Sequence, residues 1–265
     1  MMPRVMQAKF LFLGTGASAG VPIIGCSCAV CRSANPHNKR LRPSGLLRVG
    51  AKSILIDIGP DFRQQALQHK IGHLDGMLLT HTHYDHIAGI DELRVMNFRQ
   101  KAPFPCLLSQ ESLDDLHVRY YYLFQPLSEK GSHAAKLDCH VLESSDGMTE
   151  FLGIRIGYVS YAQGGMKVTG FRLGNFAYIS DIREYSPSIF DALQGVEVLV
   201  VSALRPEESP VHFSTVQAAE FAKCVGASQT FLTHLSHAID ADIALPQGVR
   251  LGFDGLEIPF EVSDG

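Results

Sequence analysis

The stretch Thr80-His81-Thr82-His83-Tyr84-Asp85-His86 decides how this 265-residue chain is interpreted. It places three imidazoles and one carboxylate within six residues, directly after the apolar run 76–79, which is typical of a buried strand. Side chains alternate along a strand, so His81 and His83 leave its end on the same side. Imidazole and carboxylate groups are ligands of divalent transition metals. We predict that this segment helps to hold two adjacent metal ions; a surface loop that is rich in histidine by chance is the alternative.

Composition and charge narrow the class of protein. Apolar residues make up 46% of the chain and charged residues 19%, which is ordinary for a soluble globular protein. The net charge of −4 supplies no basic field that would attract nucleic acid or an anionic membrane. No apolar stretch approaches the roughly 20 residues that span a bilayer, and the first residues lack the features of a secretory signal. We therefore expect a cytoplasmic protein with no membrane partner and no nucleic-acid partner.

Short strand-like runs outnumber helical stretches along the chain. The predicted strands cover 10–13, 53–58, 77–80, 106–109, 137–142, 154–159, 168–173, 176–180, 196–203, 230–235 and 256–262. The predicted helices cover 61–69, 87–96, 112–123, 186–193 and 214–225. Strands come in groups with helices at intervals, which favours two sheets covered by helices, an α/β (α+β) architecture, over a doubly wound parallel sheet. Because no linker or repeat interrupts the pattern, we predict one domain over 1–265.

A cluster of cysteines near the N-terminus indicates a second kind of metal site. Cys26, Cys28 and Cys31 form the pattern C-x-C-x-x-C. Three thiolates this close together suit zinc, which in structural sites is tetrahedral and needs a fourth donor. A disulfide is the alternative, but it would leave one cysteine over and is disfavoured in a reducing compartment. We predict a structural zinc that holds the loop at about 21–42 and supplies folding energy to it.

Residues 81–86 read H-x-H-x-D-H, which resembles the signature of the metallo-β-lactamase fold superfamily. The segments 55–59, 175–181 and 231–237 also resemble strand ends of that superfamily. Within it, the cysteine cluster and the closing run 253–258 are similar to the PhnP-type phosphodiesterases, which act on cyclic ribosyl phosphate. The resemblance extends from about residue 10 to 260 and implies a four-layer αββα sandwich.

The resemblance also implies the ligands of two divalent ions, zinc or manganese. Six side chains are implied: His81 and His83 for one ion, Asp85, His86 and His234 for the other, and Asp181 as the bridge between them. It further implies His237 as the fourth ligand of the structural zinc. Asp85 and His212 are implied as catalytic residues, His212 as the acid that protonates the leaving group.

The sequence departs from the family pattern at one position. Relatives carry a histidine in the segment before a strand that reads Gly-Phe-Arg, and counting back from Gly170 places it on Gln163. No histidine lies between 141 and 211 that could replace it. A glutamine amide oxygen is a neutral and weaker ligand, so Gln163 is a doubtful ligand and the His81/His83 ion should bind less tightly.

Together these features imply a metal-dependent hydrolase that cleaves a small or cyclic phosphodiester with hydroxide held by two metals. Two alternatives stay open: a thioester or lactone hydrolase, and a non-catalytic or weakly active member with an altered first metal site. The aromatic run 120–124 could pack in the core, line a pocket or contact a second copy of the chain, and the last of these would make a homodimer.

Overall fold

The computed structural model describes residues 5–125 and 134–263, which form two seven-stranded sheets. The strands of the first sheet are β1 (Val5–Gly14), β2 (Ser44–Val49), β3 (Lys52–Ile56), β4 (Gly76–Leu78), β5 (Phe104–Leu108), β6 (Leu137–Val141) and β14 (Glu257–Ser263). Those of the second are β7 (Asp146–Phe151), β8 (Ile154–Gln163), β9 (Met166–Leu173), β10 (Phe176–Ile179), β11 (Val198–Ser202), β12 (Gln229–Thr233) and β13 (Val249–Leu251). Their orders are β14-β1-β2-β3-β4-β5-β6 and β13-β12-β11-β10-β9-β8-β7.

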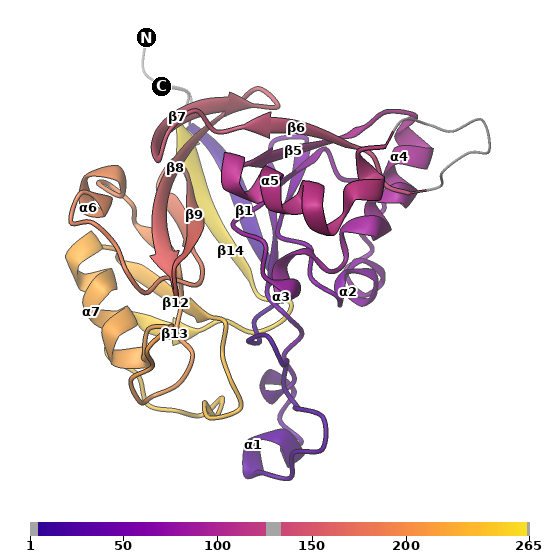
Figure 1. Cartoon of the computed structure of the whole chain (residues 1–265). Coiled ribbons are helices and arrows are strands. Elements are labelled where there is room, and N and C mark those ends of the chain that lie inside the picture. Colours follow the sequence, from indigo (N-terminus) through magenta and orange to yellow (C-terminus); the bar gives the residue numbers. More distant parts are fainter. Residues whose placement is uncertain (1–4, 126–133, 264–265) are drawn as a thin grey trace.

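Helices cover the outer face of each sheet. They are α2 (Phe62–Gln68), α3 (Tyr84–Ile87), α4 (Arg94–Gln100), α5 (Gln110–Arg119), α6 (Ile189–Ala192) and α7 (Thr215–Val225), with 3-10 turns η2 (Ile90–Leu93) and η3 (Tyr121–Leu123). The short helix α1 (Ala29–Arg32) and the 3-10 turn η1 (Pro36–Asn38) lie instead in a segment that projects from the sandwich (Figure 1). Figure 1 shows α2 to α5 on one side of the two sheets and α6 and α7 on the other. This arrangement confirms the four-layer αββα sandwich.

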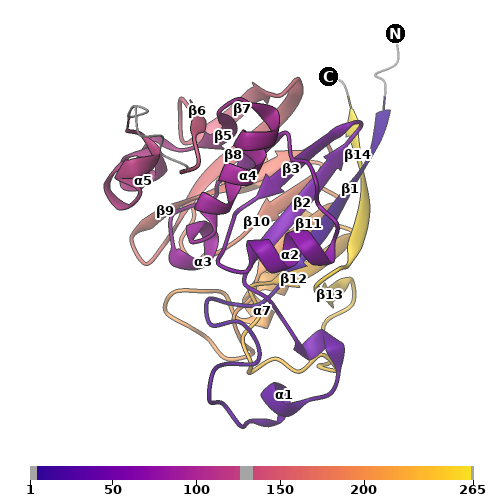
Figure 2. The same cartoon turned by 90° about the vertical axis from the view of Figure 1, so that its right-hand side faces the viewer.

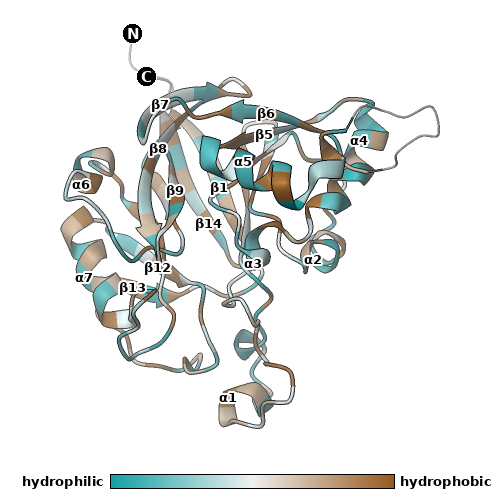
Figure 3. Cartoon of the chain, viewed as in Figure 1, coloured by the Kyte–Doolittle hydropathy of each residue, from teal (hydrophilic) through white to brown (hydrophobic). Residues whose placement is uncertain are grey.

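The main core lies between the two sheets. It includes the rings of Phe10, Phe12, Phe171 and Phe176, all fully buried. Each such side chain contributes about 1.5–3 kcal/mol by leaving water. Two further apolar clusters lie between the sheets and their helices, one on each side of the sandwich. Figure 3 shows that apolar residues follow the strands, while the outer helices α5 and α7 mix polar and apolar positions.

Three strands were absent from the sequence prediction, each for a local reason. β7 has a mostly exposed, polar edge sequence, and β13 has only three residues. β2 begins with Ser44 and Gly45, a pair typical of turns. Gly45 is required within the sheet because a Cβ there would lie 2.3 Å from the Phe10 ring. A tertiary contact therefore overrides the local preference.

The helix predicted over 87–96 is wrong in its boundaries. The structure has α3, then η2, then α4, which continues to Gln100. The helix is interrupted at Gly89, whose backbone N–H donates to Ile58 O at 2.9 Å. A Cβ at this position would lie 2.3 Å from Gly59 O. By contrast, α7 begins as predicted at the Ser214 cap, which forms a capping box with Gln217, and ends at Gly226 with φ 80°.

Three strands end in a polar residue with left-handed backbone. Asp57 follows β3, Asp181 follows Ser180 at the end of β10, and His234 follows β12, with φ values of 58°, 54° and 58°. Non-glycine residues rarely adopt this conformation, and where they do they are concentrated at functional sites. The strand ends therefore bring three polar side chains to one region of the molecule.

The segment between Gly20 and Arg40 projects from the sandwich and carries α1 (Figures 1 and 2). Val21 and Arg40 close its base through two backbone hydrogen bonds of 2.8 and 2.7 Å. Its own apolar cluster is small, with Val21, Val30 and Cys31 as the buried members. In the part of the chain that the structure describes, none of the helices has the length and apolar character to cross a bilayer.

Candidate metal centres

Asp57 and Thr80 fix the orientation of two histidines of the H-x-H-x-D-H segment. Asp57, fully buried, accepts hydrogen bonds from the Thr80 hydroxyl at 2.8 Å and from His86 Nδ1 at 2.6 Å. The Thr80 hydroxyl in turn accepts from His81 Nδ1 at 2.9 Å, because its own proton is given to Asp57. When these two rings are neutral, the proton is therefore on Nδ1 and the lone pair is on Nε2. Metal-binding histidines are commonly oriented in this way by a hydrogen-bond acceptor at the other ring nitrogen.

The Nε2 atoms converge on two carboxylates. His86 Nε2 lies 3.2 Å from Asp181 Oδ2 and 3.5 Å from Asp85 Oδ2. His234 Nε2 lies 3.1 Å from Asp181 Oδ1 and 3.2 Å from Asp85 Oδ2. His86 Nε2 is buried, yet it makes no hydrogen bond within the described residues. Two ligands at about 2.0–2.1 Å from a tetrahedral zinc lie roughly 3.3 Å apart, so these separations fit a shared ion.

The charges of this cluster favour a cation. Burial opposes ionisation of Asp181 and Asp85, but His234 and His86 outweigh it and hold the pKa of both carboxyl groups below the usual range. Burial also opposes charge on His86, yet the surrounding carboxylates raise its pKa well above the ordinary value. A buried pair of ionised carboxylates thus demands positive charge, which either protons on imidazole or divalent metals can supply.

His81 and His83 lie at one side of the cluster. Their facing nitrogens, His81 Nε2 and His83 Nδ1, are 3.0 Å apart, and the His81 and His86 ring centroids are 4.1 Å apart. Burial lowers the pKa of His81 well below its ordinary value, so this ring is neutral, as a metal ligand must be. His83 is half-buried, and burial lowers the pKa of its ring as well.

Gln163 and His212 lie at the other side. The Gln163 amide nitrogen is 2.9 Å from His212 Nε2, and the Gln163 carbonyl oxygen is buried with no hydrogen-bond partner within the described residues. His212 Nδ1 lies 3.6 Å from Asp181 Oδ1, and the ring stacks on His234 with centroids 4.8 Å apart. Burial, with a smaller effect of His234, lowers the pKa of His212 to about 4.

Three overlapping groups in this cluster could hold a metal, since their ligand atoms lie within 4.8 Å of one another. They are His81, His86 and Asp181; Asp85, His86 and His234; and Asp181, His212 and His234. The second group contains the three side chains expected for one ion, and Asp181 joins the other two groups. The residues present therefore fit a divalent metal.

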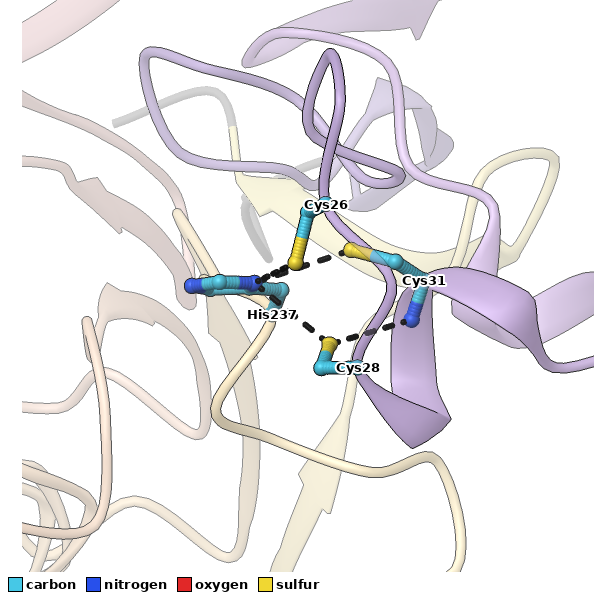
Figure 4. A group of neighbouring side chains, drawn as sticks. All are labelled: Cys26, Cys28, Cys31 and His237. Carbon is cyan, nitrogen blue, oxygen red and sulfur yellow. Dashed lines mark hydrogen bonds between the residues drawn. The ribbon is translucent and has the colours of Figure 1, made fainter.

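The cysteine cluster and His237 form a separate group (Figure 4). His237 Nδ1 lies 3.3 Å from Cys26 Sγ and 3.6 Å from Cys28 Sγ and Cys31 Sγ. A tetrahedral zinc with bonds of about 2.3 Å to sulfur and about 2.0–2.1 Å to nitrogen puts these atoms roughly 3.6 Å apart. The Cys31 backbone N–H donates to Cys28 Sγ and lowers the pKa of Cys28 to about 6, which favours the thiolate that zinc binds. All three cysteines are free of disulfides.

The His/Asp cluster and the cysteine cluster share one stretch of chain after β12. Leu235, between His234 and His237, is held on both sides by Thr15 and Ala17, with backbone hydrogen bonds of 2.8 and 3.0 Å. The buried Arg40 guanidinium donates to Ser236 O at 3.0 Å and Ile239 O at 2.8 Å. The base of the projecting loop is thus tied directly to the segment that carries both histidines.

Two surface cavities are lined in part by residues close in sequence to members of the His/Asp cluster. One, of about 320 Å³, lies beside Thr82, and its charged lining residues are Glu111, Asp115, Arg119 and Lys167. The other, of about 610 Å³, lies beside the neighbours of Asp181 and His212, and its lining residues include Arg183, Tyr185, Pro210 and Phe213.

Asp57 is a contributor to this site to which the sequence assigned no role. Its contact with His86 spans 29 residues, and no spacing rule predicts it. A usable signal was present nevertheless, because strands ending in Asp57, Asp181 and His234 share the pattern of an apolar run followed by a metal-ligand residue type. Of the predicted side chains, His83 contacts His81 but belongs to none of the groups whose ligand atoms converge, and Gln163 lies against His212. The others lie in the His/Asp cluster or in the cysteine cluster.

A family model and two solved structures match this chain over most of its length. A family model described as beta-lactamase superfamily domain matches residues 52–235. The crystal structure of a new diphosphatase from the PhnP family superposes with a TM-score of 0.89 at 33% identity, covering 98% of this chain and 100% of that chain. Zinc-bound PqqB from Methylobacterium extorquens shares the fold, with a TM-score of 0.74 at 17% identity over 94% of this chain and 99% of that one.

One curated protein with a different activity is also similar. Octanoyltransferase from Porphyromonas gingivalis is 34% identical over 255 residues, which cover 94% of this chain and 51% of that protein. The chain therefore spans about half the length of this relative.

Proposed function

The chain belongs to the beta-lactamase superfamily and, within it, to the PhnP family, and from this premise we propose that it is a metal-dependent hydrolase of small phosphoric diesters. The substrate would have two groups attached to one phosphorus, either as an ester or, as in the diphosphatase relative, through a second phosphate. The proposed ions are zinc or manganese at the His/Asp cluster and a structural zinc at the cysteines.

One observation carries the proposal. His86 Nε2 presents its lone pair in a buried position 3.2 Å from the Asp181 carboxylate, and its other nitrogen is committed to Asp57. Two lone-pair atoms at this distance repel each other unless a proton or a metal lies between them. Two divalent ions bound here would supply an activated water and offset the charge of a phosphate oxygen.

The residues of the chain would then have distinct tasks. Asp57 and Thr80 keep the ligand nitrogens of His86 and His81 available. His212 would face the leaving oxygen through the ring nitrogen on the Asp181 side and stabilise it as the bond to phosphorus breaks.

A second candidate is hydrolysis of a thioester. The specific observation in its favour is the similarity to half of an octanoyltransferase, whose name describes transfer of an acyl group. The same cluster could polarise a carbonyl in place of a phosphoryl group.

Turnover by the purified protein, loaded with zinc or with manganese, would test the proposal against three substrates. These are bis-p-nitrophenyl phosphate, the monoester p-nitrophenyl phosphate and octanoyl-coenzyme A. We expect the diester to be cleaved fastest, with the rate lost on chelation and restored by metal. Preferential cleavage of the thioester would select the second candidate. No cleavage of any substrate by protein with filled sites would contradict both and favour a non-catalytic role.

A further inference from the structure

Helix α5 contacts the H-x-H-x-D-H segment at Thr82, the residue between the first two histidines. The Thr82 hydroxyl donates a hydrogen bond to Asp115 Oδ2, and Arg119 Nη1 donates to the Thr82 carbonyl oxygen at 2.9 Å. Arg119 Nε also donates to Asp115 Oδ1 at 3.0 Å. The three hydrogen bonds close a ring, and we call Thr82, Asp115 and Arg119 the Thr82 clamp.

The contacts with Thr82 are the important part of this ring. Asp115 and Arg119 are four residues apart on one helix, so their side chains leave the same face. Their ion pair is partly exposed, and such a pair contributes little to stability by itself. Thr82 is only 3% exposed, and a polar group this deeply buried is costly without a partner. The hydroxyl of Thr82 therefore depends on α5 for its hydrogen bond.

His83 is the predicted metal ligand nearest to this clamp. Asp57 orients the His86 ring through Nδ1. Thr80 does the same for the His81 ring. Within the described residues, the hydrogen-bonding contact of the His83 ring is with His81 Nε2 alone, and His83 is half-buried. The position of its imidazole therefore depends on the backbone that carries it.

The clamp fixes that backbone on its N-terminal side. The Thr82 carbonyl oxygen and the His83 nitrogen belong to one planar peptide group, so the hydrogen bond from Arg119 fixes the plane that leads into His83. On the C-terminal side, the His83 carbonyl oxygen accepts from His86 N–H at 3.0 Å, at the start of α3. The His83 backbone is thus held on both sides.

We infer that Asp115 and Arg119 are positioning residues for His83, and that they set the affinity of the cluster for one of its two ions. Acting through Thr82, they hold the His83 imidazole where it can bind a metal together with His81. The inference rests on the proposed function, which supplies the ions. It assigns α5 a part in building the metal centre as well as in covering the first sheet.

Substitutions in the clamp test this inference against matched controls. Thr82→Val removes the hydroxyl at nearly constant shape, whereas Thr82→Ser keeps it. Asp115→Ala removes the acceptor. Its control is Asp114→Ala, which removes a carboxylate of the same helix that accepts from Gln110 at 2.7 Å instead. Arg119→Met removes the guanidinium and keeps most of the apolar stem.

Release of zinc from the loaded protein to a chromophoric chelator measures the Kd of each ion in turn. We expect the Kd of one ion to rise about 10- to 100-fold in Thr82→Val, Asp115→Ala and Arg119→Met, as for other partners that orient a metal ligand. The remaining ions, including the zinc of the cysteine cluster, should be held as tightly as before. Thr82→Ser and Asp114→Ala should match the unmodified protein.

Two further readouts separate positioning from a purely structural role. Thr82→Val combined with Asp115→Ala should weaken the ion no more than either change alone, because both break the same hydrogen bond. Melting temperatures identify any variant that fails to fold, and Thr82→Val, the mildest of the three, decides the outcome if the others do.

Unchanged Kd values in the three clamp variants would overturn the inference alone. Equal weakening of every ion together with a lower melting temperature would show a purely structural role and would overturn it as well. If the His/Asp cluster of the unmodified protein binds no metal, the proposed function fails together with the inference.

Discussion

The two candidate metal centres differ in what builds them. The His/Asp cluster is buried among the ends of strands from both sheets, and Asp57 and Thr80 hold two of its imidazoles through hydrogen bonds. The cysteine cluster lies half-exposed on a projecting loop with few buried apolar residues. The fold therefore preforms the first centre, whereas the second depends on its ion for the loop to keep its shape.

The two centres are also connected through the backbone. They share the short segment from His234 to His237, and Arg40 ties the loop to the carbonyl of Ser236 between them. Disturbing the cysteine centre should therefore loosen one edge of the His/Asp cluster, while disturbing the His/Asp cluster should leave the loop intact. Substitutions in each centre test this asymmetry.

The largest effect is expected for Asp181→Asn. The amide keeps the shape of the carboxylate but removes the charge between His86 and His234. Since metals contribute several kcal/mol to such reactions, turnover should fall by about 10,000-fold or more, with loss of metal from this centre only. Metal content and kcat measure the effect, and Asp138→Asn, at an exposed position of β6, is the matched control. Release of the structural zinc as well would contradict independent construction of the two centres.

A smaller and local effect is expected for Cys31→Ser. Without one thiolate the loop loses the tetrahedral site that holds α1, and its opening should become easier by about 3 kcal/mol, a roughly 100-fold rise in amide exchange between 21 and 40. Hydrogen exchange read by mass spectrometry would show it, with the sheet cores unchanged. Cys224→Ser, at an exposed lone cysteine of α7, should have no effect. Unaltered exchange in Cys31→Ser would mean that the loop does not depend on zinc.

The smallest effect concerns Asp254 at the base of the loop. Its carboxylate accepts from Thr15 N–H at 2.9 Å and Leu41 N–H at 2.7 Å, yet burial raises its pKa to about 6. The folded state thus keeps the proton to higher pH than the unfolded state does. The stability that this group contributes is complete below about pH 4 and is lost as the pH rises through about 6, by about 3 kcal/mol in all, of which about 2 kcal/mol is lost between pH 4.5 and pH 7.

Denaturant unfolding at pH 4.5 and pH 7 would measure this change, with Asp254→Asn as the non-titrating reference. The stability difference between the unmodified protein and the variant should shrink from the lower to the higher pH. An increase over the same interval would show that the pKa of Asp254 is lowered in the folded protein.

The sequence predicted those parts of the fold and the site that depend on local pattern. The apolar runs located most strands, and H-x-H-x-D-H with the cysteine cluster identified the family, which the comparisons confirm. Contacts between residues that are distant in the sequence could not be predicted from it. The break at Gly89 results from its approach to Gly59, and β2 results from Gly45 packing against Phe10.

The same limit applies within the site. The position of Gln163 could be counted from the neighbouring strand, but its partner could not, because β8 and the loop before α7 meet only in the folded protein. Asp57 likewise acts through His86, which is distant in sequence. Side chains that touch a metal leave a spacing in the sequence, whereas side chains that orient them do not.

Anomalous diffraction from crystals of the purified protein, recorded at the zinc and manganese absorption edges, tests the central claim most directly. We predict two adjacent peaks between His86, His234 and the carboxylates of Asp85 and Asp181, and a separate zinc peak among Cys26, Cys28, Cys31 and His237. Absence of any peak at the His/Asp cluster, with His81, His86 and His234 directed at bulk solvent, would contradict it.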